Sequence, residues 1–176
     1  MTTSLATATI ADLEQHPGRC ELIDGEIIAM APNGFLHARV MTRVARLLDA
    51  HIDGAGAILS GDPGFVWDNS NVRAPDVAYL SPEQVLQAPR RGFMSLVPLL
   101  IVEVVSPTDR WNEVRAKARG WIEHGAHLVW IVDPDERSVD VYVAGASAPL
   151  VLSAADTLTG DPVLPGFSVP VHALFP

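Results

Sequence analysis

Cysteine is almost missing from this chain of 176 residues, which contains only Cys20. A single thiol excludes an internal disulfide and any zinc site built from cysteines. No nucleophile signature surrounds Cys20, so we expect it to be a small buried hydrophobic side chain beside a strand. The sequence gives no support for a function based on thiol chemistry.

Long hydrophobic runs are also missing. The longest, around residues 96–105, is interrupted by Pro98 and Glu103 and is far shorter than the roughly 20 residues of a membrane helix. The first 16 residues lack the positive charge and apolar stretch of a secretory signal. We therefore expect residues 1–18 to be a short lead-in, and the protein to be cytoplasmic with no membrane contact.

Positive charge is scarce, because 12 lysines and arginines face 21 acidic residues, for a net charge of −9. Phosphate contacts normally require a basic surface, so this balance argues against a general polyanion binder. Two considerations weaken that objection. Metal-binding carboxylates add to an acidic total until a cation offsets them, and two groups of arginines recur at helical spacing: Arg39, Arg43 and Arg46, then Arg110, Arg115 and Arg119.

Apolar periodicity and turn residues predict a single domain over residues 1–176, of the α/β class. Asp24-Gly25 predicts a hairpin between strands at 21–23 and 26–30, and an apolar residue every fourth position predicts a helix over 35–52. The remaining predicted elements are a strand at 65–67, an extended segment at 71–80, a short helix within 81–91, and short strands and turns from 138 to 175.

Residues 99–133 predict a strand–helix–strand unit. Two near-continuous apolar runs, Leu99–Val105 and His127–Asp133, are typical of strands buried on both faces. The helix between them should begin at Ser106–Asp109, where hydroxyls and an early proline favour a cap, and should end near His124. Such a crossover is right-handed and makes its two strands parallel neighbours. The predicted architecture is a central mixed sheet flanked by helices, with an N-terminal β-hairpin.

Two carboxylates attract attention within this framework. Glu103 interrupts a buried apolar strand, where a charge is costly unless a cation or a donor pairs with it; the alternative is an edge position with the side chain in water. Asp76 follows Pro75 at a strand entrance, and alone would be common turn punctuation. If they converge, the two acids could bind a hard cation such as Mg²⁺.

Lys117 is the only lysine, against eleven arginines. It lies three residues after Val114 and four before Trp121, so it borders the buried face of the predicted helix. A compact point charge is therefore a candidate for chemistry there, although an ordinary lysine at a helix margin would look the same. Glu21 and His37 are more often structural when each is considered alone.

These residues together resemble the Uma family, a bacterial family of the PD-(D/E)XK, restriction-endonuclease-like superfamily. The likeness covers about Cys20 to Tyr142. It rests on the following residues: Glu21-Leu22-Ile23-Asp24-Gly25-Glu26-Ile27, Met30-Ala31-Pro32, His37, Pro75-Asp76-Val77, Glu103-Val104-Val105-Ser106-Pro107-Thr108, Lys117, Trp121, Gly125 and Trp130-Ile131-Val132-Asp133-Pro134.

The resemblance implies a restriction-endonuclease-like core that cleaves nucleic acid, with DNA expected rather than RNA. It also implies Mg²⁺ as the cofactor, which Mn²⁺ could replace. It assigns metal binding to Asp76, Glu103 and the carbonyl of Val104, catalysis to those two acids with Lys117 and Glu21, and an accessory role to His37. Arg73 and Arg110 would contact nucleic acid, and a homodimer is a candidate assembly.

The sequence departs from the superfamily pattern at two positions. The usual lysine, two residues after the second acid, is Val105 here, so Lys117 would supply the ammonium from the following helix. Trp121 stands where the family more often has tyrosine, which bears on packing. Two other functions stay open: a catalytically silent module that binds nucleic acid or protein, and a metal-dependent hydrolase acting on another substrate.

Overall fold

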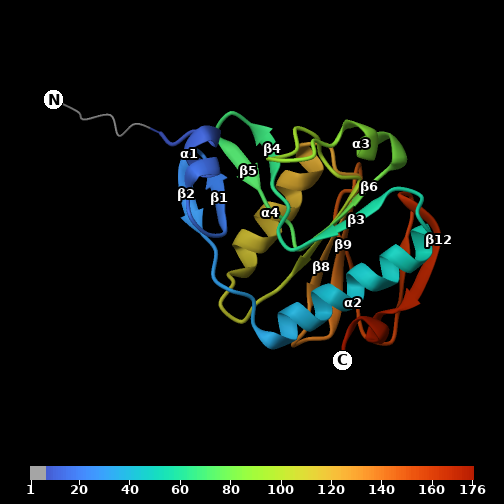
Figure 1. Ribbon diagram of the computed structural model, residues 1–176. Coiled ribbons are helices and arrows are strands. Elements are labelled where there is room, and N and C mark those ends of the chain that lie inside the picture. Colours follow the sequence, from blue (N-terminus) through green and yellow to red (C-terminus); the bar gives the residue numbers. More distant parts are fainter. Residues whose placement is uncertain (1–6) are drawn as a thin grey trace.

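A six-stranded mixed sheet organises the computed structural model of the protein, which describes residues 7–176 (Figure 1). The strand order is β10-β9-β8-β7-β6-β3. Only β7 and β8 pair in parallel, which confirms the predicted crossover; the other pairs are antiparallel. The strands are β3 (Ala57–Ser60), β6 (Val77–Leu80), β7 (Leu100–Val104), β8 (Leu128–Asp133), β9 (Ser138–Val143) and β10 (Leu150–Leu152).

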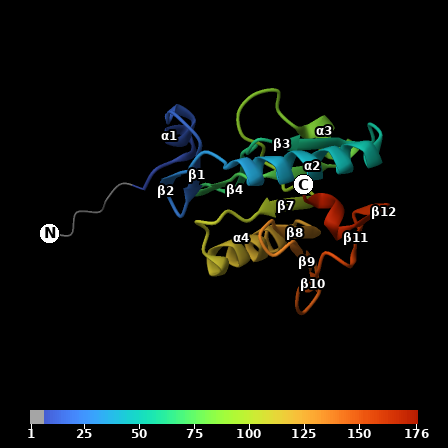
Figure 2. The same cartoon turned by 90° about the horizontal axis from the view of Figure 1, so that it is seen from below.

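Two helices cover opposite faces of this sheet (Figure 2). Helix α2 (Phe35–Ile52) packs on one face through Val40, Val44 and Leu48, and α4 (Trp111–Glu123) packs on the other through Ala118 and Trp121. Successive side chains of a strand point to opposite faces. The odd-numbered residues of β7 therefore face α4, and this register turns the carboxylate of the buried strand toward that helix.

A second sheet has the order β2-β1-β5-β4 and includes the predicted N-terminal hairpin. Asp24 and Gly25 both have positive φ, at 50° and 76°, as a type I′ hairpin turn requires. β11 and β12 form a separate pair. The remaining elements are α1 (Ile10–Gln15), β1 (Cys20–Ile23), β2 (Glu26–Ala29), β4 (Phe65–Asp68), β5 (Asn71–Arg73), α3 (Pro82–Gln87), β11 (Thr157–Gly160), β12 (Leu164–Pro170) and a 3₁₀ helix (Val171–Leu174).

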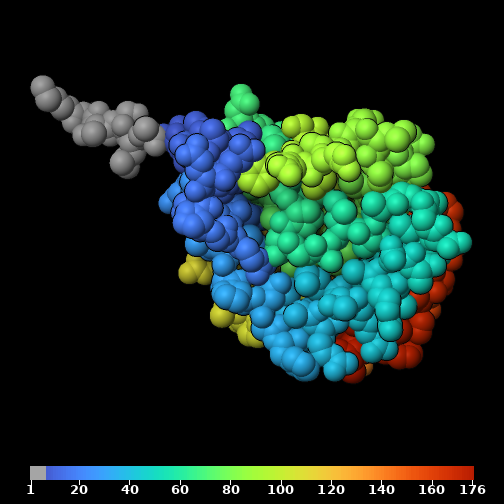
Figure 3. Space-filling view, in the orientation of Figure 1, coloured from blue at the N-terminus to red at the C-terminus, as the bar shows by residue number. Residues whose placement is uncertain are grey.

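The N-terminal segment differs in part from the predicted lead-in, of which residues 1–6 lie outside the described part. Thr9 and Asp12 form a capping box that begins α1, and Leu13 is buried against Leu22 and Val72. This helix and the hairpin form one end of the molecular surface (Figure 3). Cys20 is half-buried rather than fully buried.

One predicted boundary is also wrong. Helix α4 begins at Trp111 rather than within 106–109, because Ser106 N–H donates to the Asp109 carboxylate and Asp109 N–H donates back to the Ser106 carbonyl. That reciprocal pair closes a turn before the helix. The predicted extended segment 71–80 is present as β5 and β6, which belong to different sheets.

Two further elements differ from the prediction. Strand β3 was not predicted, and residues 171–174 form a 3₁₀ helix where short strands and turns were expected. In the part of the chain that the structure describes, no helix has the length and apolarity that a membrane crossing would need.

Candidate active site

Glu103 lies on β7 with its side chain turned toward α4, and it is only 6% exposed. Its two oxygens accept hydrogen bonds from different residues of that helix: Trp121 Nε1 donates to Oε1 at 2.8 Å, and Lys117 Nζ donates to Oε2 at 3.0 Å. Lys117 and Trp121 are four residues apart and therefore share one face of α4. The buried carboxylate is paired, as its desolvation requires.

Asp76 stands at the chain's passage between the two sheets, directly before β6. Its Oδ2 accepts the backbone N–H of Val104 at 2.7 Å, and its Oδ1 lies 3.3 Å from His37 Nε2. The N–H contact places Asp76 at the end of β7, next to the residue that follows Glu103. His37 comes from the first turn of α2, on the other side of the large sheet.

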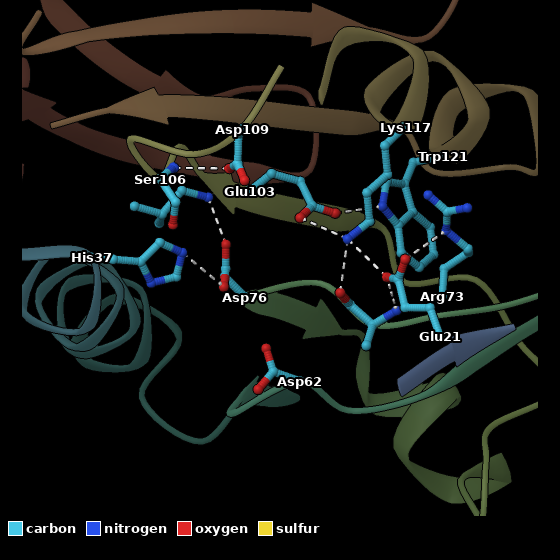
Figure 4. A network of polar contacts seen from close by, with 12 residues as sticks. Glu21, His37, Asp62, Arg73, Asp76, Glu103, Ser106, Asp109, Lys117 and Trp121 are labelled. Atoms are coloured by element: carbon cyan, nitrogen blue, oxygen red, sulfur yellow. Dashed lines mark hydrogen bonds and ion pairs between the residues drawn. The ribbon is translucent and has the colours of Figure 1, made fainter. Parts of the chain in front are cut away.

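Lys117 joins the two sheets (Figure 4). Besides Glu103, its ammonium contacts Glu21 Oε1 at 2.9 Å and donates to the Ala74 carbonyl at 2.9 Å. Glu21 belongs to β1 of the smaller sheet, where it also accepts the Ala74 N–H at 2.8 Å and faces Arg73 Nε at 3.3 Å. The side chain of Lys117 is 15% exposed.

All residues that the sequence analysis assigned to the site line one cleft of about 850 Å³. Its floor is formed by the acids and the lysine, and Arg110 lies at its rim, 78% exposed and 3.2 Å from Glu113. Arg73 is held inward, with its guanidinium 5.2 Å from the Trp67 ring. The residues brought together are Glu21, His37, Arg73, Asp76, Glu103, Val104, Arg110 and Lys117.

Crowding of these charges shifts several pKa values. Burial raises the pKa of Glu103 to about 7, with Lys117 opposing and the carboxylates of Asp76 and Glu21 adding to the rise. Burial would lower the pKa of Lys117, but Glu103 and Glu21 outweigh it and raise that pKa. Burial would raise the pKa of Glu21, yet Lys117 and Arg73 hold it below its ordinary value.

His37 is shifted by the same surroundings. Burial would lower its pKa, but the Asp76 carboxylate, helped by the Val104 carbonyl, raises it above the ordinary value. Lys117 and His37 therefore both favour their protonated forms, and each faces a carboxylate of the cleft. Protonated partners of this kind partly offset the buried negative charge.

The donor set of the cleft is compatible with a hard divalent cation. Asp76 and Glu103 offer carboxylate oxygens that each keep a further lone pair beyond the contacts described. Val104, the residue after Glu103, donates its backbone N–H to Asp76 and so lies beside both acids. Within residues 7–176 no three histidine, cysteine or acidic side chains form a ready metal cage. Two acids and a carbonyl suit Mg²⁺, which retains several waters, better than a cation that needs a full set of protein ligands.

The structure ties Trp121 to this site and places the Arg19–Asp62 ion pair near it, neither of which the sequence analysis anticipated. Trp121 bears on the site as well as on packing, through its hydrogen bond to Glu103. Arg19 forms an ion pair with Asp62, whose side chain is 7% exposed. The Oδ1 atom of Asp62 has no hydrogen-bond partner in the described chain. Burial raises the pKa of Asp62, and the Asp76 carboxylate adds to the rise. Asp62 follows Gly61 and precedes Pro63-Gly64, a combination typical of a turn, so the sequence did not indicate a role for Asp62 at the site.

Comparisons with known proteins bear on the fold and on the family of this chain. The chain is similar over its length to a solved structure described as a "putative nuclease belonging to DUF820" from Anabaena variabilis, with a TM-score of 0.82, 16% sequence identity, and coverage of 95% of this chain and 97% of that one. At this identity the likeness establishes the fold. A comparison with curated proteins gives no significant match. A family model described as "Putative restriction endonuclease" matches residues 8–172, so the chain belongs to the Uma2 family of restriction-endonuclease-like proteins.

Proposed function

We propose that this protein is a metal-dependent endonuclease of the PD-(D/E)XK type that hydrolyses phosphodiester bonds of nucleic acid, with DNA as the first substrate to test. The observation that carries the proposal is the meeting of Glu21, Asp76, Glu103 and Lys117 in one cleft, from β1, the β5–β6 passage, β7 and α4. Three acids and an ammonium around an open cleft have the composition that metal-assisted phosphodiester hydrolysis needs.

Asp76, Glu103 and the Val104 carbonyl are the proposed ligands. A divalent cation, Mg²⁺ or Mn²⁺, would supply there Lewis-acid stabilisation of phosphate charge and a bound water of lowered pKa. Glu103 is held by Trp121 and Lys117, and Asp76 by the Val104 N–H. Those contacts restrict both carboxylates before any ligand binds, which lowers the entropic cost of using them.

Lys117 is proposed to stabilise charge rather than to remove a proton. Its raised pKa keeps the ammonium protonated at neutral pH, so it is a poor general base and a good electrostatic partner for phosphate oxygens. Glu21 holds it at 2.9 Å from the side opposite Glu103. The superfamily's usual lysine position is occupied here by Val105, which carries no charge. The contacts of Lys117 with Glu21 and Glu103 provide another way to hold an ammonium in the cleft.

The test is a cleavage time course on supercoiled plasmid, single-stranded DNA and RNA, with Mg²⁺, Mn²⁺ or excess EDTA. We expect metal-dependent nicking or cutting by the wild type and none by Asp76→Asn, a nearly isosteric change that removes one ligand charge. A folded wild type that is inert on every substrate in both metals would contradict the proposal.

The alternative of a catalytically silent binding module is favoured by one observation, the net charge of −9, because a catalytic polyanion binder gains from a basic surface. Binding of an unlabelled partner protein or of nucleic acid by an inert wild type would support it. Equal binding by wild type and Asp76→Asn, with no cleavage by either, is the pattern that this alternative predicts.

A further inference from the structure

Helix α2 carries three arginines on one outward flank, which we call the α2 arginine stripe: Arg39, Arg43 and Arg46. Their spacing of four and three residues places them on the same face, beside the buried positions Val40 and Val44. With Phe35, Ala38, Thr42 and Pro176 they line a groove of about 380 Å³. The helix forms a continuous part of the molecular surface (Figure 3).

The stripe is positively charged, and its arginines lie outside the ion pairs of the described residues. The cations that have a carboxylate within ion-pair distance are Arg19, His37, Arg73, Arg110, Arg115 and Lys117. Across residues 7–176, none of the three stripe arginines has such a partner. In addition, Arg43 Nε is buried and lacks a hydrogen-bond acceptor in the described chain. In a protein of net charge −9, a local cluster of free guanidinium groups is suited to an anionic ligand.

An exposed aromatic ring begins the same helix. Phe35 is 76% exposed, and the Arg39 guanidinium lies 5.6 Å from the centre of its ring. An exposed ring of this size has no packing role in the fold. A free aromatic face next to guanidinium groups is the combination on which an unpaired nucleic-acid base stacks while its phosphates bind arginine.

The stripe also begins where the cleft ends. Gly34 and His37 line the cleft, and Phe35 lies between them at the start of α2. From Arg39 to Arg46 the helix rises about 10 Å, at about 1.5 Å per residue. That length is comparable with the axial rise of about three stacked nucleotides of one strand, at about 3.4 Å each.

We propose that the α2 arginine stripe binds the sugar–phosphate backbone of a single nucleic-acid strand that leads into the cleft, with one base stacked on Phe35. The inference rests on the proposed function and specifies the path and the strand state of its substrate. A single strand fits better than a duplex, because stacking on Phe35 requires a free base face, and in a duplex each base face is covered by the neighbouring base pair.

Binding can be measured without turnover by fluorescence anisotropy of a labelled 20-nucleotide single-stranded DNA in EDTA, at several NaCl concentrations. We expect the triple variant Arg39→Gln/Arg43→Gln/Arg46→Gln to bind at least tenfold more weakly at low salt. The slope of log affinity against log salt should fall by about 2, since each lost phosphate contact on a single strand removes about 0.7. Thermal melts compare the folding of all variants.

Two further variants separate charge from stacking. Arg90→Gln/Arg91→Gln removes two exposed arginines from the loop after α3, which also lack an ion pair in the described structure, and should leave affinity and slope unchanged. Phe35→Ala should weaken single-strand binding several-fold without changing the slope, because stacking releases no counterions.

Wild-type affinity and slope in the folded triple variant would overturn the proposal, as would an equal loss in the Arg90/Arg91 control or no single-strand binding by the wild type. Tighter binding of the matching duplex, with no effect of Phe35→Ala, would overturn the single-strand assignment. A wild type that binds through the stripe and cuts nothing would refute the nuclease and retain the stripe. A wild type that cleaves nucleic acid, together with a triple variant that binds it normally, would retain the nuclease and refute the stripe.

Discussion

The ammonium of Lys117 is shared by two carboxylates from different sheets, so a single side chain links the proposed chemistry of the cleft to the stability of the fold. Glu21 and Glu103 both lie about 3 Å from it and are almost fully buried. Removing one partner of a buried charged network leaves the others uncompensated, typically at a cost of about 3–5 kcal/mol. Variants at this position must therefore be assayed well below their melting temperature.

Lys117→Ala is predicted to bind nucleic acid nearly normally and to cleave it slowly. If the ammonium acts mainly on the transition state, its loss lowers turnover far more than binding, typically by about 100-fold or more. Lys117→Arg should recover little, because a planar guanidinium is a poor substitute for a point charge held between two acids. Single-turnover cleavage rates together with anisotropy give both quantities.

A folded Lys117→Ala protein with wild-type turnover would remove the lysine from the mechanism and leave the nuclease proposal standing. A parallel loss of binding and turnover would assign Lys117 to ground-state binding instead. Circular dichroism at the assay temperature shows whether each variant is folded.

Glu103 should make the metal-free protein less stable as pH rises from about 4.5 to about 7. Its pKa is raised from 4.5 in an ordinary environment to about 7 in the fold, so the folded state retains a proton that the unfolded chain releases in this range. The free energy of unfolding should then fall with increasing pH, by at most about 1.4 kcal/mol per unit for one proton.

Glu103→Gln should flatten that decrease when the free energy of unfolding is measured by urea titration in EDTA. His37 also has a raised pKa and acts in the same direction above its ordinary value of 6.5, so the comparison is cleanest between pH 4.5 and 6.5. An equally steep decrease in the variant would assign the titration to another group.

At the scale of elements, the two helices that cover the large sheet contribute different side chains to the core and to the cleft. Helix α2 contributes a buried apolar row to the core and His37 at its first turn to the cleft. Helix α4 packs through Ala118 and Trp121 and presents Lys117 from the margin of the same face. Both helices must therefore dock in the right rotation before the cleft residues meet.

Leu48→Ala on α2 should reduce the free energy of unfolding by about 2–5 kcal/mol, since Leu48 is fully buried and its truncation leaves a cavity. Urea unfolding curves measure the change. Leu86→Ala on α3 is the matched control, because Leu86 is 88% exposed and should change the stability by less than about 0.5 kcal/mol. Equal effects of the two substitutions would contradict the observed packing of α2.

At the scale of the whole molecule, the cleft brings together segments from residues 21 to 117 and from both sheets. Each acid of the cleft is partly paired, but several carboxylates lie close together there, and their combined negative charge favours binding of a cation. Occupation of the site would thus stabilise the entire fold by mass action.

Mg²⁺ or Mn²⁺ is predicted to raise the melting temperature of the wild type. Metal at about 100 times its Kd would add about 2.7 kcal/mol, which for a chain of this size corresponds to about 5–10 °C. Asp76→Asn should lose most of this response and keep its fold, as measured by differential scanning fluorimetry. The same metal response in Asp76→Asn would place the cation elsewhere.

Much of the fold was determined by local sequence. The Asp24-Gly25 turn, the apolar row of α2 and the two buried runs around α4 predict their elements because each pattern repeats with the period of one kind of structure. Strand β3 and α1 were missed, since short elements carry few periods, and the start of α4 was wrong because the same polar residues that cap helices also close turns.

The candidate site was determined by sequence only as a set of residue types. A buried acid at Glu103, a lone lysine and the family resemblance identified its members, and the structure placed them in one cleft. Tertiary structure alone decided that Trp121 hydrogen-bonds Glu103, that Glu21 and Glu103 share one ammonium, and that Asp62 lies near Asp76. These contacts join residues up to 96 positions apart, and their formation depends on how two sheets and two helices dock, which periodicity along the chain does not encode.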